Sequence, residues 1–308
     1  MTGASFQRLM DSLMSDESQA AAPLPDEGVY PIREVSRLTG VNAVTLRAWQ
    51  RRYGLVQPAR TEKGHRLYSE QDIRQIGEIL SWLERGVSIG QVKGLLSEPQ
   101  SAPVSDHWQQ TLEQFSQALL AFNQRKAEAE LGDLLASYPF ELVRSRVLQP
   151  LVERLLGLWR ERPDGELLQQ VWLGWLHTRF ARHLIEQEKG VPVTLASWGQ
   201  VGPLDLVWAA YELIGQGYEV QLLGAVEPRH ATLLEGRATP PWLILLGAGL
   251  GKQDQAAEWP EGTRFFGELG RLYDEPWRRA RNWHATLTEV SATTRTAKAK
   301  GKGGRTPS

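Results

Sequence analysis

The spacing of apolar residues predicts a helical bundle in the middle of the chain. Between residues 106 and 189 apolar side chains return every three or four positions, most clearly at Leu112, Phe115, Leu119 and Phe122. This spacing places the apolar side chains on one face of a helix, and that face must pack against another element. We therefore expect a bundle of about four helices over residues 106–189.

The pattern changes after residue 190 and predicts a small parallel sheet. Short apolar runs over 191–196, 218–224 and 241–247 alternate with a helix-like segment over 204–214. Strands that alternate with helices form parallel sheets with crossover helices. Residues 190–277 are therefore expected to form a Rossmann-like, flavodoxin-like α/β domain.

Short helical patterns separated by glycines predict a compact helical module over residues 29–98. Ile32, Val35 and Leu38 share one face of a first helix, which stops at Gly40. Asn42 then offers a side-chain oxygen to cap a second helix, expected from about residue 43 to 53. Two helices joined by such a turn form a helix-turn-helix, whose second helix presents its N-terminal end to base edges.

The second helix is expected to keep its basic side chains away from the core. Leu46 and Trp49 point toward the core. The side chains left on other faces are Thr45, Arg47, Arg51 and Arg52. Arginine suits a DNA-reading helix because its planar fork can bind guanine or a phosphate through two hydrogen bonds.

Positive charge is concentrated in this module although the whole chain is nearly neutral. The 308 residues carry a net charge of −1, yet residues 30–68 hold eight Lys and Arg against two Glu. Gly64 allows a tight hairpin there, flanked by Arg60, Lys63, His65 and Arg66. A basic hairpin beside a helix-turn-helix is suited to lie along the phosphate backbone as a wing.

The ordered string over residues 44–55, VTLRAWQRRYGL, resembles the signature of the MerR family of winged-helix regulators. Pro58, Arg60, Thr61 and the run over 64–67 continue that resemblance. The variant AWQRRYG resembles the branch that contains the curli regulators and the cobalamin-dependent light regulators.

The resemblance implies a dimer that sits on a pseudo-palindromic promoter and distorts the DNA to control RNA polymerase. Relatives dimerise through a long helix after this module, a role that could fall here to residues near 69–96 with the bundle. Similarity to the curli regulators further implies control of biofilm, matrix or stress genes. The family roles fall on Thr45 and Arg47 in the recognition helix, on Arg51 or Arg52 at phosphates, and on Lys63, His65 and Arg66 in the wing.

The second half of the chain resembles the cobalamin-binding half of the light regulators, but its ligand positions differ. Those relatives carry a Trp followed after nine residues by Glu-His, and from Trp159 this spacing reaches Gln169 and Gln170. Their sheet domain carries a cobalt-binding His in the loop after its first strand, where Gly202 stands here. Glycine has no side chain that could bind a metal. We therefore expect no bound cobalamin and no other cofactor or metal.

Three alternatives stay open for this half. It could belong to a cobalamin-dependent photoreceptor with rearranged ligands, in which His177 or His183 replaces the missing histidine. It could be an enzyme, although we find no cluster of acid–base or nucleophilic groups and expect none. It could be an interaction platform anchored by some of the twelve tryptophans.

Composition narrows the remaining possibilities. The chain has no cysteine, which excludes disulfides, thiolate metal sites and cysteine nucleophiles. No apolar run reaches about 18 residues and no secretory signal opens the chain, so we expect a cytoplasmic protein. Residues 1–28 and 278–308 favour a disordered leader and a basic disordered tail. The expected partners are promoter DNA, RNA polymerase, a second copy and an effector or protein of unknown identity.

Overall fold

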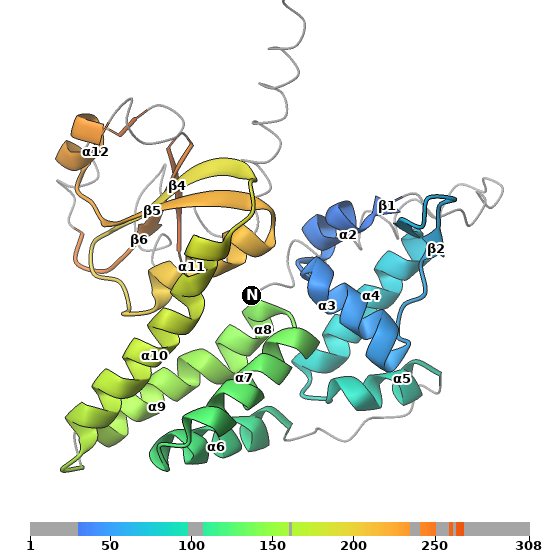
Figure 1. The fold of residues 1–308 in the computed structure, drawn as a ribbon, viewed down its shortest axis with the longest axis horizontal. Coiled ribbons are helices and arrows are strands. Elements are labelled where there is room, and N and C mark those ends of the chain that lie inside the picture. The colour runs from blue at the N-terminus through green and yellow to red at the C-terminus, as the bar shows by residue number, and fades with distance from the viewer. Residues whose placement is uncertain are drawn as a thin grey trace, which may run out of the picture. The chain divides into compact units, whose positions relative to one another are not determined.

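The computed structural model describes residues 30–97, 107–159, 162–234, 241–250, 259–260 and 263–267 (Figure 1). Contacts divide the chain into two compact units, Met1–Trp172 and Leu173–Ser308. The expected leader at 1–28 and tail at 278–308 lie outside the described residues. None of the described helices is long and apolar enough to cross a lipid bilayer.

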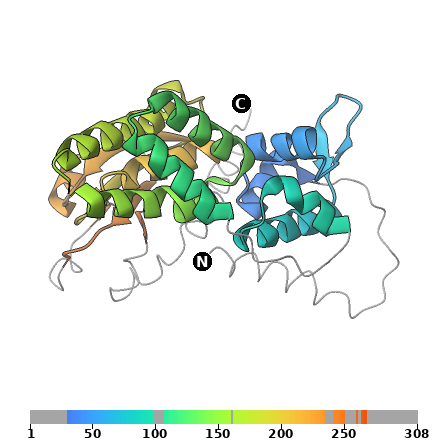
Figure 2. The same ribbon diagram turned by 90° about the horizontal axis from the view of Figure 1, so that it is seen from below.

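The first unit begins with the expected winged helix-turn-helix. Its elements are β1 (Tyr30–Pro31), α2 (Ile32–Thr39), α3 (Ala43–Ala48), η2 (Trp49–Tyr53), β2 (Ala59–Arg60), β3 (Arg66–Tyr68), α4 (Glu70–Glu84) and α5 (Ile89–Ser97). Strand β3 pairs antiparallel with both β1 and β2. Figure 2 shows the hairpin between β2 and β3 standing away from the helices as a wing.

Both helix boundaries of the helix-turn-helix follow the sequence signals. Gly40 ends α2 with a φ of 71°, and its N–H donates to the carbonyl of Ser36 at 3.0 Å. Asn42 caps α3, because its side-chain oxygen accepts the Val44 N–H at 2.8 Å. The second helix spans residues 43–53 as expected, and its second half, η2, is π-helical.

The first unit continues with the expected helical bundle. Its elements are α6 (His107–Leu120), α7 (Gln124–Ser137), α8 (Phe140–Val143), η3 (Arg144–Leu148), α9 (Gln149–Trp159) and the start of α10 (Gly165–Glu186). Phe115 and Leu119 are fully buried in the bundle. Phe122, which shares their spacing, is 45% exposed, because α6 ends at Leu120 and Phe122 takes a left-handed φ of 51°.

Hydrogen bonds join the helix-turn-helix to the bundle, and we call this set of contacts the dock. The Trp49 indole donates to the carbonyl of Ser137 at 2.8 Å, and the Tyr53 hydroxyl lies 3.2 Å from the Ser137 hydroxyl. The Trp108 indole donates to the carbonyl of Leu83 at 2.8 Å. These bonds connect α6 and α7 to η2 and α4, so part of the recognition helix is held by the bundle.

A second set of dock contacts surrounds Tyr138. The Ile89 N–H donates to the Tyr138 hydroxyl at 3.2 Å, and the same hydroxyl lies 2.8 Å from His107 Nε2. Burial lowers the pKa of His107 and raises the pKa of Tyr138. Burial therefore favours the neutral form of both side chains.

The second unit contains the expected parallel sheet. Its strands are β4 (Val191–Trp198), β5 (Tyr218–Ala225), β6 (Trp242–Leu246) and β7 (Arg264–Phe266). They follow the order β5-β4-β6-β7, with every described pair parallel. Helix α11 (Asp205–Gly215) packs on β4 and β5, and α12 (Pro228–Leu234) follows β5. Val193 and Leu195 enter one core while Ala196 and Trp198 enter another, so both faces of β4 are buried.

Trp49→Phe tests the dock. Phenylalanine keeps an aromatic ring in the core but leaves the Ser137 carbonyl without its donor. We expect the free energy of unfolding of the first unit to fall by about 1–3 kcal/mol, measured by urea denaturation of the full chain. Trp82→Phe is the control, since Trp82 is only partly buried and stacks under Arg85. Equal losses in the two variants would contradict the role of the Trp49 bond.

Candidate nucleic-acid interface

The recognition helix presents one exposed stripe to solvent. Val44, Arg47 and Arg51 follow each other at helical spacing, with Val44 57% exposed and Arg51 exposed. Arg47 is half-buried between them. Leu46 and Trp49 are buried as expected, at 1% and 0% exposure. The stripe therefore presents two guanidinium groups and one apolar side chain on the surface of the module.

Thr45 does not belong to this stripe, contrary to the expectation from sequence. Its exposure is 2%. Thr45 lies one turn before Trp49, on the face of α3 that is in contact with α7 of the bundle. The sequence suggests only one buried face for the helix, whereas the bundle covers a second one.

Arg52 also faces a different direction from the stripe. Its side chain is exposed and lines a cleft together with Glu130 and Asp133 of α7. The structure therefore separates the two neighbouring arginines. Arg51 stays with the exposed stripe, whereas Arg52 lines the cleft.

The wing is a short hairpin closed at its tip by backbone hydrogen bonds. The Thr61 N–H donates to the carbonyl of His65 at 2.9 Å, and the Gly64 N–H donates to the carbonyl of Thr61 at 2.8 Å. Gly64 has a φ of 80°, a conformation that side chains with a Cβ rarely adopt. This turn leaves Arg60, Lys63 and His65 exposed.

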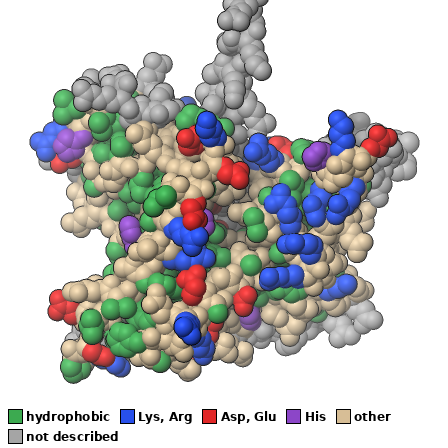
Figure 3. Space-filling view, viewed as in Figure 1, with side chains coloured by type: hydrophobic (Ala, Val, Ile, Leu, Met, Phe, Trp, Pro, Cys, Tyr) green, Lys and Arg blue, Asp and Glu red, His purple; other side chains and the backbone are tan. Residues whose placement is uncertain are grey.

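Arg66 connects the wing to the recognition helix. Its Nε donates to the side-chain oxygen of Gln50 at 2.6 Å, and the residue is half-buried. This bond orients the wing strand relative to the stripe. Figure 3 shows Lys and Arg side chains gathered over this part of the molecule.

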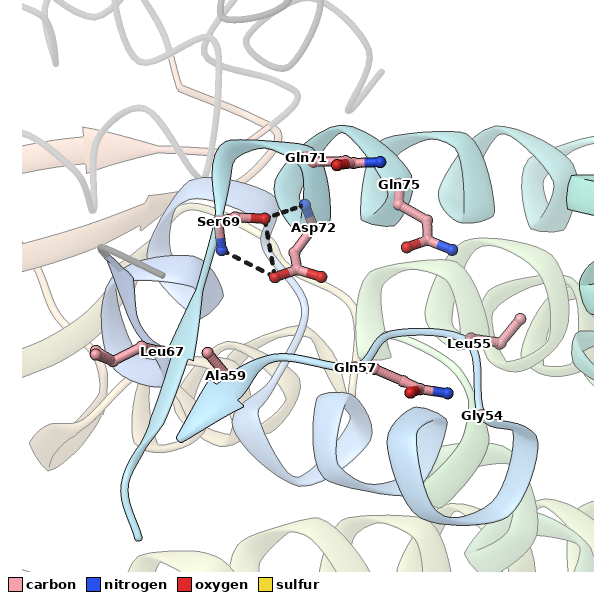
Figure 4. Close-up of a pocket in the computed structure, with 9 residues that line it drawn as sticks. All are labelled: Gly54, Leu55, Gln57, Ala59, Leu67, Ser69, Gln71, Asp72 and Gln75. Carbon is pink, nitrogen blue, oxygen red and sulfur yellow. Dashed lines mark hydrogen bonds between the residues drawn. The ribbon is translucent and has the colours of Figure 1, made fainter. Parts of the chain in front are cut away.

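A pocket beside the wing is formed by structural groups. It has a volume of about 450 Å³ and lies between the end of η2, the wing strands and α4 (Figure 4). The one carboxylate that lines it, Asp72, accepts the Ser69 N–H at 2.8 Å, while Ser69 Oγ accepts the Asp72 N–H at 3.1 Å. This reciprocal pair is a capping box that starts α4. The Asp72 carboxylate therefore serves to start α4.

A hydrogen bond holds the loop after β4 at the position where the resemblance to the light regulators implies a histidine. The Gly202 N–H donates to Asp205 Oδ2 at 2.8 Å. A Cβ placed on Gly202 would lie 2.8 Å from the same oxygen, closer than a Cβ normally approaches another heavy atom. The residues present therefore do not fit a cobalt ligand at this position.

The other positions that the vitamin would require are in helices. Trp159 is the last residue of α9. Gln169 is half-buried and Gln170 is exposed, both in α10, and neither has the chemistry of the Glu-His pair. Among the described residues, no group of three or more His, Asp or Glu side chains could hold a metal ion.

The two histidines of α10 have different surroundings. His177 is exposed, whereas His183 is half-buried with its ring against the edge of Tyr211, at 4.7 Å between centroids. Burial lowers the pKa of His183, and Arg179 lowers it further. His183 is therefore biased toward its neutral form.

Comparison with known proteins agrees with this geometry. The family model described as MerR HTH family regulatory protein matches residues 30–99. The transcriptional regulator MlrA of Salmonella typhimurium is 39% identical over 245 residues, which cover 79% of this chain and 99% of MlrA. The chain belongs to the MerR family of transcriptional regulators.

The likeness of this MerR-family regulator to MlrA extends beyond the DNA-binding module. MlrA of Escherichia coli is 31% identical over 217 residues, covering 70% of this chain and 88% of that protein. The transcriptional repressor CarH of Myxococcus xanthus is 27% identical over 141 residues, covering 41% of this chain and 46% of CarH. These relatives place the regulator in the branch that holds MlrA and CarH.

Gly202→Ala tests the closed loop. The Asp205 carboxylate can move away from the added Cβ only by giving up its bond to the Gly202 N–H, so we expect the free energy of unfolding of the second unit to fall by about 1 kcal/mol. Adding Asp205→Ala removes the crowded oxygen, and the double variant should then lose less than the sum of the two single changes. Urea denaturation of the full chain measures all three. Strict additivity would show that the two residues do not interact.

Proposed function

We propose that this regulator binds promoter DNA as a homodimer and controls transcription through RNA polymerase, with a C-terminal half that does not bind cobalamin. The observation that carries the proposal is the exposed stripe of the recognition helix next to a basic wing. Each module offers one short reading helix, and two copies would read the two halves of a pseudo-palindromic site. The relatives named transcriptional regulators support this reading.

The proposal assigns different tasks to the basic residues. Arg47 near the start of the recognition helix reaches base edges, where its guanidinium can bind guanine through two hydrogen bonds. Arg51, Arg60, Lys63 and His65 contact phosphates and set the register of the protein on the duplex. Arg66 and Gln50 hold the wing in place. Thr45 and Arg52 are left out of the interface, because one is buried and the other lines the cleft.

The proposed dimer does not rest on one long helix after the wing. The described segment over residues 70–97 forms two helices, α4 and α5, with Gly86 between them at a φ of 90°. We therefore assign the pairing of two copies to the module together with the bundle.

The proposed target genes rest on similarity alone. Relatives named MlrA cover the chain more fully than CarH does. On the similarity to curli regulators we propose control of biofilm, matrix or stress genes.

Arg47→Ala tests the reading helix. A binding site is first selected from random duplex DNA with the full chain. We expect the variant to bind that site with a free energy of binding weaker by about 1–3 kcal/mol and to discriminate less against one altered base pair. Lys63→Ala should instead weaken binding on all sequences alike and reduce the salt dependence of binding.

Arg125→Ala is the matched control, since it removes the same charge from the exposed surface of α7 in the bundle. Fluorescence anisotropy with the selected site and a scrambled site measures each variant. If Arg47→Ala and Arg125→Ala bound the selected site equally well, the assigned recognition helix would be wrong.

Absorbance of the purified chain mixed with adenosylcobalamin in the dark tests the proposed loss of the vitamin. We expect the spectrum after gel filtration to contain no bound cobalamin, because Gly202 supplies no imidazole and its loop is closed on Asp205. A retained, light-sensitive spectrum would instead support the second candidate, a photoreceptor with rearranged ligands. His183→Ala would then abolish that spectrum if His183 had become the ligand, with exposed His177→Ala as its comparison.

A further inference from the structure

A polar cleft lies between the recognition helix and the bundle, within the first unit. Its volume is about 420 Å³, which falls in the range of roughly 300–1,000 Å³ found for small-molecule sites. Arg52 and Tyr53 of η2 contribute one wall, and Glu130 and Asp133 of α7 contribute another. Thr111 and Gln114 of α6 add neutral polar groups.

The charged groups of the cleft stand apart from one another. Glu130 and Asp133 are three residues apart and therefore lie on the same side of α7. No ion pair joins either carboxylate to Arg52 in the described part of the chain. Glu130 Oε1 lies 3.8 Å from Lys126 Nζ, whereas its other oxygen, Oε2, is buried without a donor among the described residues. A buried carboxylate oxygen without a donor is costly.

We propose that this cleft binds a small zwitterion of the amino-acid class. Its ammonium group lies near Glu130 and Asp133 and supplies a donor to the buried Oε2 of Glu130. Its carboxylate lies near Arg52. The three charged side chains that line the cleft sum to −1, and Lys126, whose Nζ lies 3.8 Å from Glu130 Oε1 outside the lining, brings the local charge to zero. A ligand with no net charge keeps this balance.

The position of the cleft links such a ligand to the dock. Ser137 and Tyr138 line the cleft and also hold the helix-turn-helix through Trp49, Tyr53 and Ile89. A bound zwitterion touches the recognition helix and the bundle at once, so it favours the docked arrangement. Its role as an effector of transcription rests on the proposed function, whereas its binding does not.

Isothermal titration of the full chain without DNA tests the site. L-Glutamine and L-citrulline, which carry no net charge near neutral pH, are the zwitterionic probes, and putrescine and succinate are probes that carry charge of one sign only. We expect the zwitterions to bind the unmodified chain. We expect Arg52→Gln, Asp133→Asn and Glu130→Gln each to weaken this binding about tenfold, the cost of one charge-assisted hydrogen bond.

Glu128→Gln is the matched control, because it removes one carboxylate from the exposed side of the same helix and should change the affinity less than about twofold. Asp133 is exposed, so Asp133→Asn keeps the site testable if Glu130→Gln fails to fold. The proposal would be overturned if neither zwitterion gave heat at millimolar concentration, or if putrescine or succinate bound more tightly than the zwitterions. It would also be overturned if Arg52→Gln and Asp133→Asn left the affinity unchanged.

DNA binding of the same preparations separates this site from the proposed function. A chain that binds the zwitterions but selects no DNA sequence would contradict the proposed function and would still support the proposed zwitterion site. A chain that selects a DNA site but binds neither zwitterion would contradict the cleft alone.

Discussion

The hydrogen bond between the Trp49 indole and the Ser137 carbonyl determines how the first unit is organised. Trp49 is fully buried, and its N–H has to find an acceptor because an unpaired buried donor is costly. The acceptor belongs to the last residue of α7, so the middle of the recognition helix is tied to the end of a bundle helix. The orientation of the DNA-reading surface relative to the bundle follows from that bond and its neighbours at Tyr53, Trp108 and Tyr138.

The recognition helix accordingly carries three surfaces on eleven residues. One packs into the helix-turn-helix through Leu46, one meets the bundle through Thr45 and Trp49, and one presents Arg47 and Arg51. A helix with two buried faces leaves a narrow exposed stripe, which limits how many side chains can reach DNA. The same geometry places Arg52 in the cleft that residues of the helix-turn-helix and of the bundle line together.

The sheet unit has a glycine in the loop after its central strand, where the resemblance to the light regulators implies a histidine. Six successive residues of β4, from Val193 to Trp198, are buried, so the central strand is stabilised by packing on both faces. The loop that follows is held by the bond from Gly202 to Asp205. The packing of the central strand therefore does not depend on the residue at position 202.

Local signals in the sequence determined much of this protein. Gly40 and Asn42 predicted where the first helices end and begin, Gly64 predicted the wing, and the apolar runs after residue 190 predicted a parallel sheet. These features depend on backbone conformation and on residues close in sequence. The ordered string over residues 44–55 likewise predicted the MerR family, which the comparisons confirmed.

Only the tertiary structure decided which face of the recognition helix is free. The periodicity of the helix shows that Leu46 and Trp49 point inward. It does not show that α7, whose last residue Ser137 lies 88 residues after Trp49, packs against the helix as well. For the same reason the sequence could not separate Arg51 from Arg52, or bring Arg52 to one cleft with Glu130 and Asp133. Burial by a distant helix depends on long-range packing, which leaves no mark in the local pattern of residues.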